Sequence, residues 1–410
     1  MIYYHADWVV PIVDAPFRNG WIAVDRNRIV ALSRRGPTDG SREVDLGCVA
    51  VMPGVVNAHT HLELSYLRNE VPPAPEFVQW IRAVMSARRR RPDPRSPEIL
   101  SAIDRAIDEA VACGTAVVGD ITNTLVTFEP LARSPLAGVV FYELIRFNAA
   151  DPEGFVEAAT HELEALVSTD RLRASLAAHA PYSVAPLVFR AIRHAVDRNP
   201  FAACSVHLAE SVEEVEFIRS GSGPWRTLLE DVGAWDPKWT PPGGSPVQFL
   251  DDSGFLDRRV LAVHGVQMMA DDLQRLKSRG CTIVTCPRSN LYTGAGTPPI
   301  ADFYASGLKV AVGTDSLASC ADLNVFAELA AMRALAPRVP AATLVESATL
   351  QGARALGFDA LYGTIEPGKS ARLLAVDVPR HVYDVEEYLV SGVTPSRLRW
   401  MDTKATRIAD

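Results

Sequence analysis

Five of the nine histidines and one aspartate stand at or near the ends of short apolar runs rich in β-branched residues. They are His59, His61, His179, His207, His264 and Asp315. Because His59 and His61 are two positions apart, on a strand both imidazoles point to one side and can share a cation. Taken alone, such a pair is equally consistent with histidines that are hydrogen-bonded locally in a core or on a surface.

The wider set of His59, His61, His207 and Asp315 is harder to explain without a metal. Three neutral imidazoles and one carboxylate suit Zn²⁺ or Fe²⁺ and leave a coordination position for water. Ca²⁺ and Mg²⁺ instead prefer ligand sets made of oxygen. The sequence therefore predicts a divalent metal site, with zinc as the first choice and iron as the alternative.

Three further residues complete the candidate chemistry. Glu210 lies three residues after His207, where its carboxyl could reach a substrate atom on the side opposite the metal. Without a metal, Glu210 would be an acidic residue at a helix start, which the helix dipole favours. With the metal it becomes a candidate proton shuttle. His264 could orient the metal-bound water, and His179 could hydrogen-bond the substrate.

The runs that carry these residues alternate with longer amphipathic segments, which is the pattern of strand and helix units around a parallel sheet. Eight runs can be counted, at residues 48–61, 114–122, 137–145, 173–181, 201–210, 259–265, 281–290 and 308–316. Eight such units predict an α/β fold, a (β/α)8 TIM barrel over residues 53–361, whose strand ends meet at one face. The candidate residues would converge at that face.

The ends of the chain are predicted to lie outside this barrel. Residues 1–52 and 362–410 contain short strand-like segments bounded by turn residues, and we expect them to form one composite, β-sandwich-like domain. Residues 221–252, between the fifth and sixth runs, are rich in Gly, Pro and Trp. This insertion is expected to lie at the barrel mouth, where it could cover the site.

Composition limits the partners. The chain has 410 residues with 41 Lys and Arg against 49 Asp and Glu, so its net charge of -8 offers no global positive field for a nucleic acid. No apolar stretch reaches the roughly 18 residues of a membrane span, and the N-terminus lacks the pattern of a secretory signal. We therefore expect a cytoplasmic protein with a small-molecule substrate. The sequence leaves open whether it acts alone or as a homodimer.

With these motifs in their order, the sequence resembles the metal-dependent amidohydrolase superfamily. Within it, the resemblance is to the aminohydrolase branch, which contains deaminases of adenosine, S-adenosylhomocysteine, guanine and triazines. It covers nearly the whole chain and rests on PGVVNAHTHLELS (53–65), HAPYSVAP (179–186), VHLAES (206–211), VHG (263–265), CPRSN (286–290) and VGTDS (312–316). Binuclear members carry a carboxylated lysine where this chain has His179, so the resemblance implies a single metal.

The resemblance also implies a mechanism. The metal would lower the pKa of its bound water toward about 7. Asp315 would take the water's proton, Glu210 would protonate a ring nitrogen of an aromatic amidine, and His264 would stabilise the attacking oxygen. Loss of ammonia would convert a 6-aminopurine into a 6-oxopurine. Two alternatives are a chlorohydrolase or cyclic amidase with the same metal set, and a scaffold protein, which would be expected to have lost one of these residues.

Within the branch, HTHLELS together with CPRSN looks most like the aminodeoxyfutalosine deaminases of menaquinone biosynthesis. Their substrate carries a benzoate, for which Arg288, Arg146 or the cluster Arg88–Arg91 would supply a cation. Glu63 would bind the ribose if the strand stayed extended beyond His61, or would hold a metal-site histidine or a loop in place, with equal weight. Adenosine, S-adenosylhomocysteine, methylthioadenosine and guanine are the alternative substrates.

Overall fold

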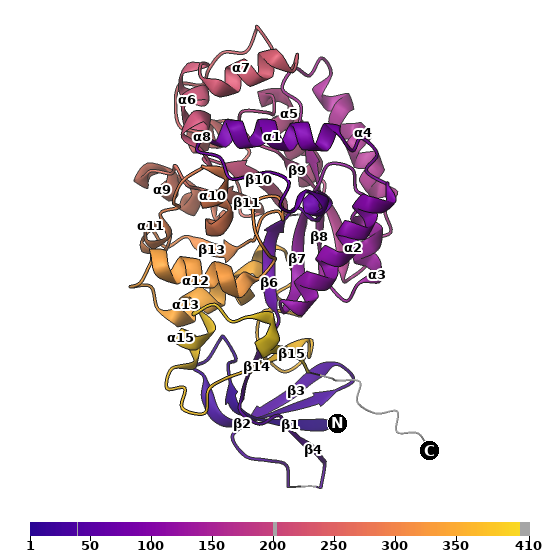
Figure 1. Cartoon of the computed structure of the whole chain (residues 1–410), viewed down its shortest axis with the longest axis vertical. Helices are drawn as coiled ribbons and strands as arrows, with labels where there is room; N and C mark the ends of the chain where they lie inside the picture. The colour runs from indigo at the N-terminus through magenta and orange to yellow at the C-terminus, as the bar shows by residue number, and fades with distance from the viewer. Residues whose placement is uncertain (39, 200–202, 402–410) are drawn as a thin grey trace.

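The barrel is built from eight parallel strands whose spatial order follows the chain (Figure 1). The computed structural model describes residues 1–38, 40–199 and 203–401, so residues 201–202 of the fifth run and 402–410 of the C-terminal segment lie outside the described residues. The strands are β6 (Val55–Thr60), β7 (Thr115–Thr122), β8 (Ala137–Leu144), β9 (Leu172–Ala178), β10 (Cys204–Leu208), β11 (Val260–His264), β12 (Thr282–Thr285) and β13 (Lys309–Val312). Each predicted run contains one of them, which confirms the predicted barrel.

Helices cover the outside of the barrel, and local sequence signals set several of their ends. Proline opens α2, α4 and α5, where its missing N–H costs nothing, and glycine in the left-handed conformation ends α6 and α9. The helices that connect the strands are α2 (Pro97–Ala112), α3 (Phe128–Arg133), α4 (Pro152–Glu164), α5 (Pro186–Asp197), α6 (Val212–Ser220), α9 (Ala270–Arg279), α10 (Pro287–Thr293), α11 (Ile300–Ala305), α12 (Val325–Leu335), α13 (Ala341–Glu346) and α14 (Gly352–Ala355).

A short polar seam joins the first and last barrel strands. The Asn57 side chain donates to the Thr314 hydroxyl at 2.8 Å and accepts from the Thr314 backbone N–H at 3.0 Å. One step further, the Asp315 backbone N–H donates to the His59 carbonyl at 3.0 Å. A Cβ on Gly313 would lie 2.7 Å from that carbonyl oxygen, so only glycine permits the close approach. The seam therefore brings His59 and Asp315 together.

The two ends of the chain form one mixed sheet of seven strands with an apolar core of its own. Its strands are β1 (Ile2–Val9), β2 (Phe17–Asp25), β3 (Arg28–Ser33), β4 (Arg42–Asp45), β5 (Val49–Pro53), β14 (Leu373–Asp377) and β15 (Leu398–Trp400). The run at 48–61, counted as one barrel unit although its first residues were assigned to the end domain, supplies β5 to this sheet and β6 to the barrel. The break falls at Gly54, where a Cβ would lie 2.6 Å from the Ala116 Cβ and 2.8 Å from the Trp400 ring.

The insertion folds into α7 (Pro224–Asp231) and α8 (Pro246–Asp252). Helix α7 lies beside α1 (Phe77–Arg89) at the end of the barrel opposite the seven-stranded sheet (Figure 1), and the Trp225 and Phe77 rings are 6.0 Å apart. The insertion thus lies at the barrel mouth, as expected. Among the described residues, no helix combines the length and the apolar character that crossing a bilayer requires.

Candidate active site

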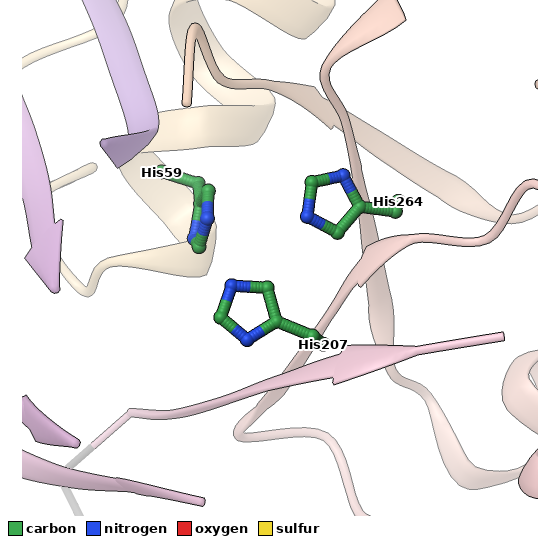
Figure 2. Close-up of side chains that lie close together, drawn as sticks. All are labelled: His59, His207 and His264. Carbon is green, nitrogen blue, oxygen red and sulfur yellow. The ribbon is translucent and has the colours of Figure 1, made fainter. Parts of the chain in front are cut away.

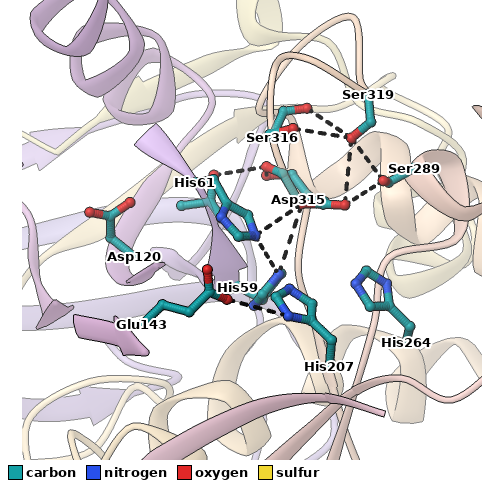
Figure 3. Close-up of polar contacts among 12 residues, drawn as sticks. His59, His61, Asp120, Glu143, His207, His264, Ser289, Asp315, Ser316 and Ser319 are labelled. Carbon is teal, nitrogen blue, oxygen red and sulfur yellow. Dashed lines mark hydrogen bonds and ion pairs between the residues drawn. The ribbon is translucent and has the colours of Figure 1, made fainter. Parts of the chain in front are cut away.

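The predicted metal ligands converge at the C-terminal ends of the barrel strands (Figure 3). The Nε2 atoms of His59 and His61 are 3.2 Å apart, and Asp315 Oδ1 lies 3.4 Å from His61 Nε2 and 3.9 Å from His59 Nε2. The prediction that one strand presents both histidines holds only in part, because β6 ends at Thr60 and His61 precedes the 3-10 helix η1 (Leu62–Leu67).

His207, on β10, faces the same point from the other side of the barrel. Its ring centre lies 5.0 Å from that of His59 and 5.3 Å from that of His264 (Figure 2). The Nδ1 atom donates to the His179 carbonyl at 2.9 Å, which directs Nε2 toward the other ligands. This is how a metal-binding histidine is usually oriented, because the second hydrogen bond fixes its tautomer.

The protonation states of these groups fit a divalent cation. Burial lowers the pKa of His59 well below its ordinary value, and the charges of His61, His207 and His264 lower it further. Burial likewise lowers the pKa of His61, against the opposing effect of Asp315. Both imidazoles are therefore neutral and can donate lone pairs, as Zn²⁺ or Fe²⁺ requires. His59, His61 and Asp315 offer donor atoms close enough together to hold one such ion, and His59, His207 and His264 form a second such group that shares His59.

Asp315 is held in a strained and specific geometry. Its backbone adopts a left-handed conformation, with φ of 59°, which is uncommon for a residue with a side chain. Oδ2 accepts from the Ser289 hydroxyl at 2.5 Å, leaving Oδ1 to face His61. Burial acts to raise the pKa of Asp315, but the charges of His61 and His264 and the Ser289 hydrogen bond lower it overall. The group is thus a carboxylate that can bind a cation or accept a proton.

Glu210 and His264 form a second pair beside the metal ligands. His264 Nε2 lies 3.5 Å from Glu210 Oε1, and the Asn290 amide donates to His264 Nδ1 at 2.9 Å, which places the ring proton on Nε2. Burial lowers the pKa of His264 to about 3. Burial also raises the pKa of Glu210 well above its ordinary value, and the charges of Asp315, Glu214 and Glu213 raise it further. This raised pKa favours the protonated form of Glu210, the form that can act as an acid.

Backbone hydrogen bonds fix the position of Glu210. The Glu210 and Ala209 N–H groups donate to the two carboxyl oxygens of Glu214 at 2.8 and 2.9 Å. Ala209 is left-handed, with φ of 52°, and Glu214 is fully buried in α6. This turn after β10 brings Glu210 to the cavity, although it follows His207 by only three residues.

His179, directly after β9, lies where a substrate could reach it. Its Nδ1 contacts the Ser183 hydroxyl at 2.5 Å, and the residue lines the cavity described below. Burial lowers the pKa of His179 to about 4, against the opposing charge of Glu143, so the ring is neutral. A neutral ring on the cavity wall suits a hydrogen bond to substrate, and this role of His179 stays a prediction.

A cavity of about 580 Å³ opens over these groups. Its inner end is lined by residues at the ends of the barrel strands, among them His61, His179, His207, Glu210, His264 and Asp315. Its outer end is lined by apolar residues from α1, the insertion and the loop after β8, among them Trp80, Met85, Phe147, Trp225, Leu229 and Val232. Cavities of this size take ligands with tens of non-hydrogen atoms, larger than a purine base alone.

Glu63 lies in η1 rather than on an extended strand, so it does not share the direction of His59 and His61. One carboxyl oxygen accepts from Arg88 at 3.0 Å. The other accepts from the Thr122 hydroxyl, from the Asn123 backbone at 3.0 Å and from both polar groups of Thr124. Glu63 is not among the residues that line the cavity. The structure thus favours its role in holding a loop over the predicted role in binding ribose.

The predicted arginines differ in what they contact. Arg288 was a candidate for the substrate carboxylate, but it pairs with Asp322 at 2.8 Å, lies near the buried Glu328 and does not line the cavity. In the cluster Arg88–Arg91, Arg88 lines the cavity but contacts Glu63 and Asn123, while Arg90 and Arg91 pair with acidic side chains outside the cavity. Arg146 lines the cavity and stacks on Phe155 at 4.7 Å, and it makes no ion pair with any of the described residues.

Sequence reasoning missed Glu143, the penultimate residue of β8. This carboxylate is buried, lines the cavity and lies 3.4 Å from His207 Nδ1 (Figure 3). Burial acts to raise its pKa, but the charges of His179, His207 and His61 and a hydrogen bond from Asn123 lower it overall. Its place at the C-terminal end of a barrel strand, the same signal that identified Asp315, could have found it.

The chain matches known proteins over most of its length. The model of the amidohydrolase family matches residues 50–397. The chain is 33% identical over 326 residues to the aminodeoxyfutalosine deaminase of Deinococcus radiodurans, covering 75% of this chain and 73% of that protein. It is 28% identical over 407 residues to the 5-methylthioadenosine/S-adenosylhomocysteine deaminase of Moorella thermoacetica, covering 93% and 88%.

A solved structure shows the same architecture with a metal bound. The adenosine deaminase from Xanthomonas campestris with bound zinc gives a TM-score of 0.80 at 27% identity, covering 97% of this chain and 90% of that chain. Fold, donor set and sequence matches therefore agree. The chain belongs to the amidohydrolase family and is a hydrolase that acts on C–N bonds.

Proposed function

We propose that the protein is a zinc-dependent deaminase that converts aminodeoxyfutalosine into futalosine and ammonia, as a step of menaquinone biosynthesis. The observation that carries the deaminase assignment is the arrangement at the inner end of the cavity, where Glu210, whose pKa burial raises well above its ordinary value, lies beside the metal donor set. A divalent ion bound by His59, His61, His207 and Asp315 would lower the pKa of a coordinated water to about 7.

The side chains at the inner end have distinct tasks in this reaction. Asp315 Oδ1, free of the serine that holds Oδ2, accepts the proton of the attacking water. Glu210 enters protonated and donates to a ring nitrogen of the purine, which makes C6 more electrophilic. The His264 Nε2–H, fixed by Asn290, donates a hydrogen bond to the oxygen as it attacks. The proton taken by Asp315 then passes to the amino group, which leaves as ammonia, and the proton of the new C6 hydroxyl returns to Glu210 as the C6 carbonyl forms.

The outer end supports a substrate longer than adenosine. The apolar lining from α1 and the insertion suits an aromatic group, and Arg146 provides a cation beside it that no described acidic side chain neutralises. An aromatic carboxylate, such as the benzoate of aminodeoxyfutalosine, fits both features. The relative from Deinococcus radiodurans carries the same assignment at 33% identity.

The test is a panel of substrates with ammonia release as the measurement. Aminodeoxyfutalosine, adenosine, methylthioadenosine, S-adenosylhomocysteine and guanine are each incubated with the zinc-loaded protein. We expect kcat/KM for aminodeoxyfutalosine to exceed the others by at least about tenfold, which corresponds to about 1.4 kcal/mol of transition-state binding. Equal or faster ammonia release from another compound would contradict the proposed substrate but not the deaminase activity. Ammonia release from none of the compounds would contradict the deaminase activity itself.

A further inference from the structure

Glu143 is the buried acidic side chain closest to His207 that the proposed reaction leaves without a task. The residue is 6% exposed, and its Oε1 accepts no hydrogen bond from the described residues. Oε1 lies 3.4 Å from His207 Nδ1. A buried carboxylate oxygen without a donor costs free energy, so an arrangement that retains one requires an explanation.

The environment of Glu143 holds the carboxylate in this orientation. Asn123 Nδ2 donates to Oε2 at 2.9 Å and to the Glu143 carbonyl at 3.2 Å. Asn123 is itself fixed, because its Oδ1 accepts from Arg88 at 2.9 Å and its backbone N–H donates to Glu63 at 3.0 Å. Through this network Glu63 and Arg88 act on the site indirectly, because they hold Asn123, whose side-chain amide orients Glu143.

Two roles are open to a carboxylate at this place. One carboxyl oxygen of Glu143 and one ring nitrogen each of His179 and His207 lie close enough together to hold an ion of their own. That second site would need a lone pair on His207 Nδ1, but this atom donates its proton to the His179 carbonyl at 2.9 Å. The geometry therefore favours a negative charge placed beside an N–H rather than a second metal site.

We propose that Glu143 is a positioning residue for His207: its carboxylate lies beside the Nδ1–H that donates to the His179 carbonyl, and this negative charge makes the imidazole a stronger ligand through Nε2. A carboxylate beside a metal-binding histidine raises the basicity of the ring and limits its rotation. The inference rests on the metal centre of the proposed function, but it concerns a residue outside the donor set.

The test measures zinc affinity rather than turnover. Wild-type protein and Glu143→Gln are stripped of metal and titrated with zinc against a chelator of known affinity. In the variant, Asn123 still donates to the amide oxygen, so the amide NH2 faces the His207 N–H and the attraction is lost. We expect zinc affinity to fall by about 10- to 100-fold while the metal-free variant unfolds at the same temperature as metal-free wild type. Glu143→Asp, which keeps the charge, should lose less.

Glu162→Gln is the matched control, because Glu162 is exposed, accepts from the Tyr142 hydroxyl next to Glu143 and lies outside the cavity. Zinc affinity in this control should equal that of wild type. Unchanged affinity in Glu143→Gln would overturn the inference, as would two zinc ions per wild-type chain with one lost in the variant. If wild type itself binds no zinc, the zinc-dependent function fails, and the inference fails with it.

Discussion

The two ends of the cavity are built on different principles. At the inner end, charged and polar groups lie on the barrel strands and are fixed by hydrogen bonds, and Ala209, His264 and Asp315 adopt left-handed backbone conformations. At the outer end, α1 and the insertion contribute apolar side chains, several of them partly exposed. Strain and dense hydrogen bonding suit a site where atoms must be placed accurately, whereas apolar packing suits the recognition of substrate shape.

The comparison predicts that substitutions at the inner end act on kcat and those at the outer end on KM. An interaction that strengthens in the transition state changes kcat, while one that is equal in the ground state and the transition state changes KM. Measuring kcat and KM for one substitution at each end therefore tests whether the inner end determines the rate and the outer end determines substrate binding.

The largest effect is expected for Asp315→Asn. The amide is a poor base and a weak ligand, so kcat should fall on the order of 10⁴-fold, and zinc content by elemental analysis should decrease. Ser289→Ala removes the hydrogen bond to Oδ2 but keeps the carboxylate, and should lose much less activity. Full turnover and full zinc content in Asp315→Asn would show that the metal centre is not the one described.

A smaller effect is expected for Val232→Asp at the outer end. Val232 is 40% exposed and lines the cavity, so the substitution should not disturb folding. A negative charge in the apolar wall should raise KM for aminodeoxyfutalosine about tenfold and leave kcat unchanged. Adenosine, which lacks the anionic aromatic group, should be much less affected. Val167→Asp, at an 82% exposed position outside the cavity, serves as the control.

Much of this architecture could be predicted because it depends on local sequence. The alternation of apolar runs and amphipathic segments located all eight barrel strands, and the strand-end rule located His207, His264 and Asp315. These features follow from periodicity and from the position of a residue within its own run. The convergence of the donors then follows from the barrel itself.

The errors came from contacts between distant segments. The turn after Thr60 directs Glu63 toward the Thr122–Thr124 loop, and nothing within HTHLELS indicates that loop. Arg288 is occupied by Asp322, which reaches it only in the folded chain. The strand-end position of Glu143 could be read from its own run, but its partners Asn123, directly after β7, and His207, on β10, come together only in the folded chain.

The last prediction concerns stability rather than turnover: it tests whether a buried carboxyl at the inner end makes the free energy of unfolding depend on pH. Burial raises the pKa of Glu214 from its ordinary value of 4.5 to about 8, with the backbone hydrogen bonds opposing that rise. Between these values the folded protein keeps a proton that the unfolded chain has lost, so this group makes stability fall as pH rises from 4.5 to 8. Glu214→Gln cannot ionise and should remove that slope. The measurement is the free energy of unfolding by denaturant at pH 5, 7 and 9. At pH 5 the variant should be less stable than wild type, because one acceptor for the Ala209–Glu210 turn is lost. By pH 9 the variant should have gained on the order of 2 kcal/mol of stability relative to wild type. Val232→Asp, in the outer wall, serves as the control and should show no such gain. If the free energy of unfolding depends on pH in the same way for Glu214→Gln and wild type, the buried carboxyl adds nothing to the pH dependence.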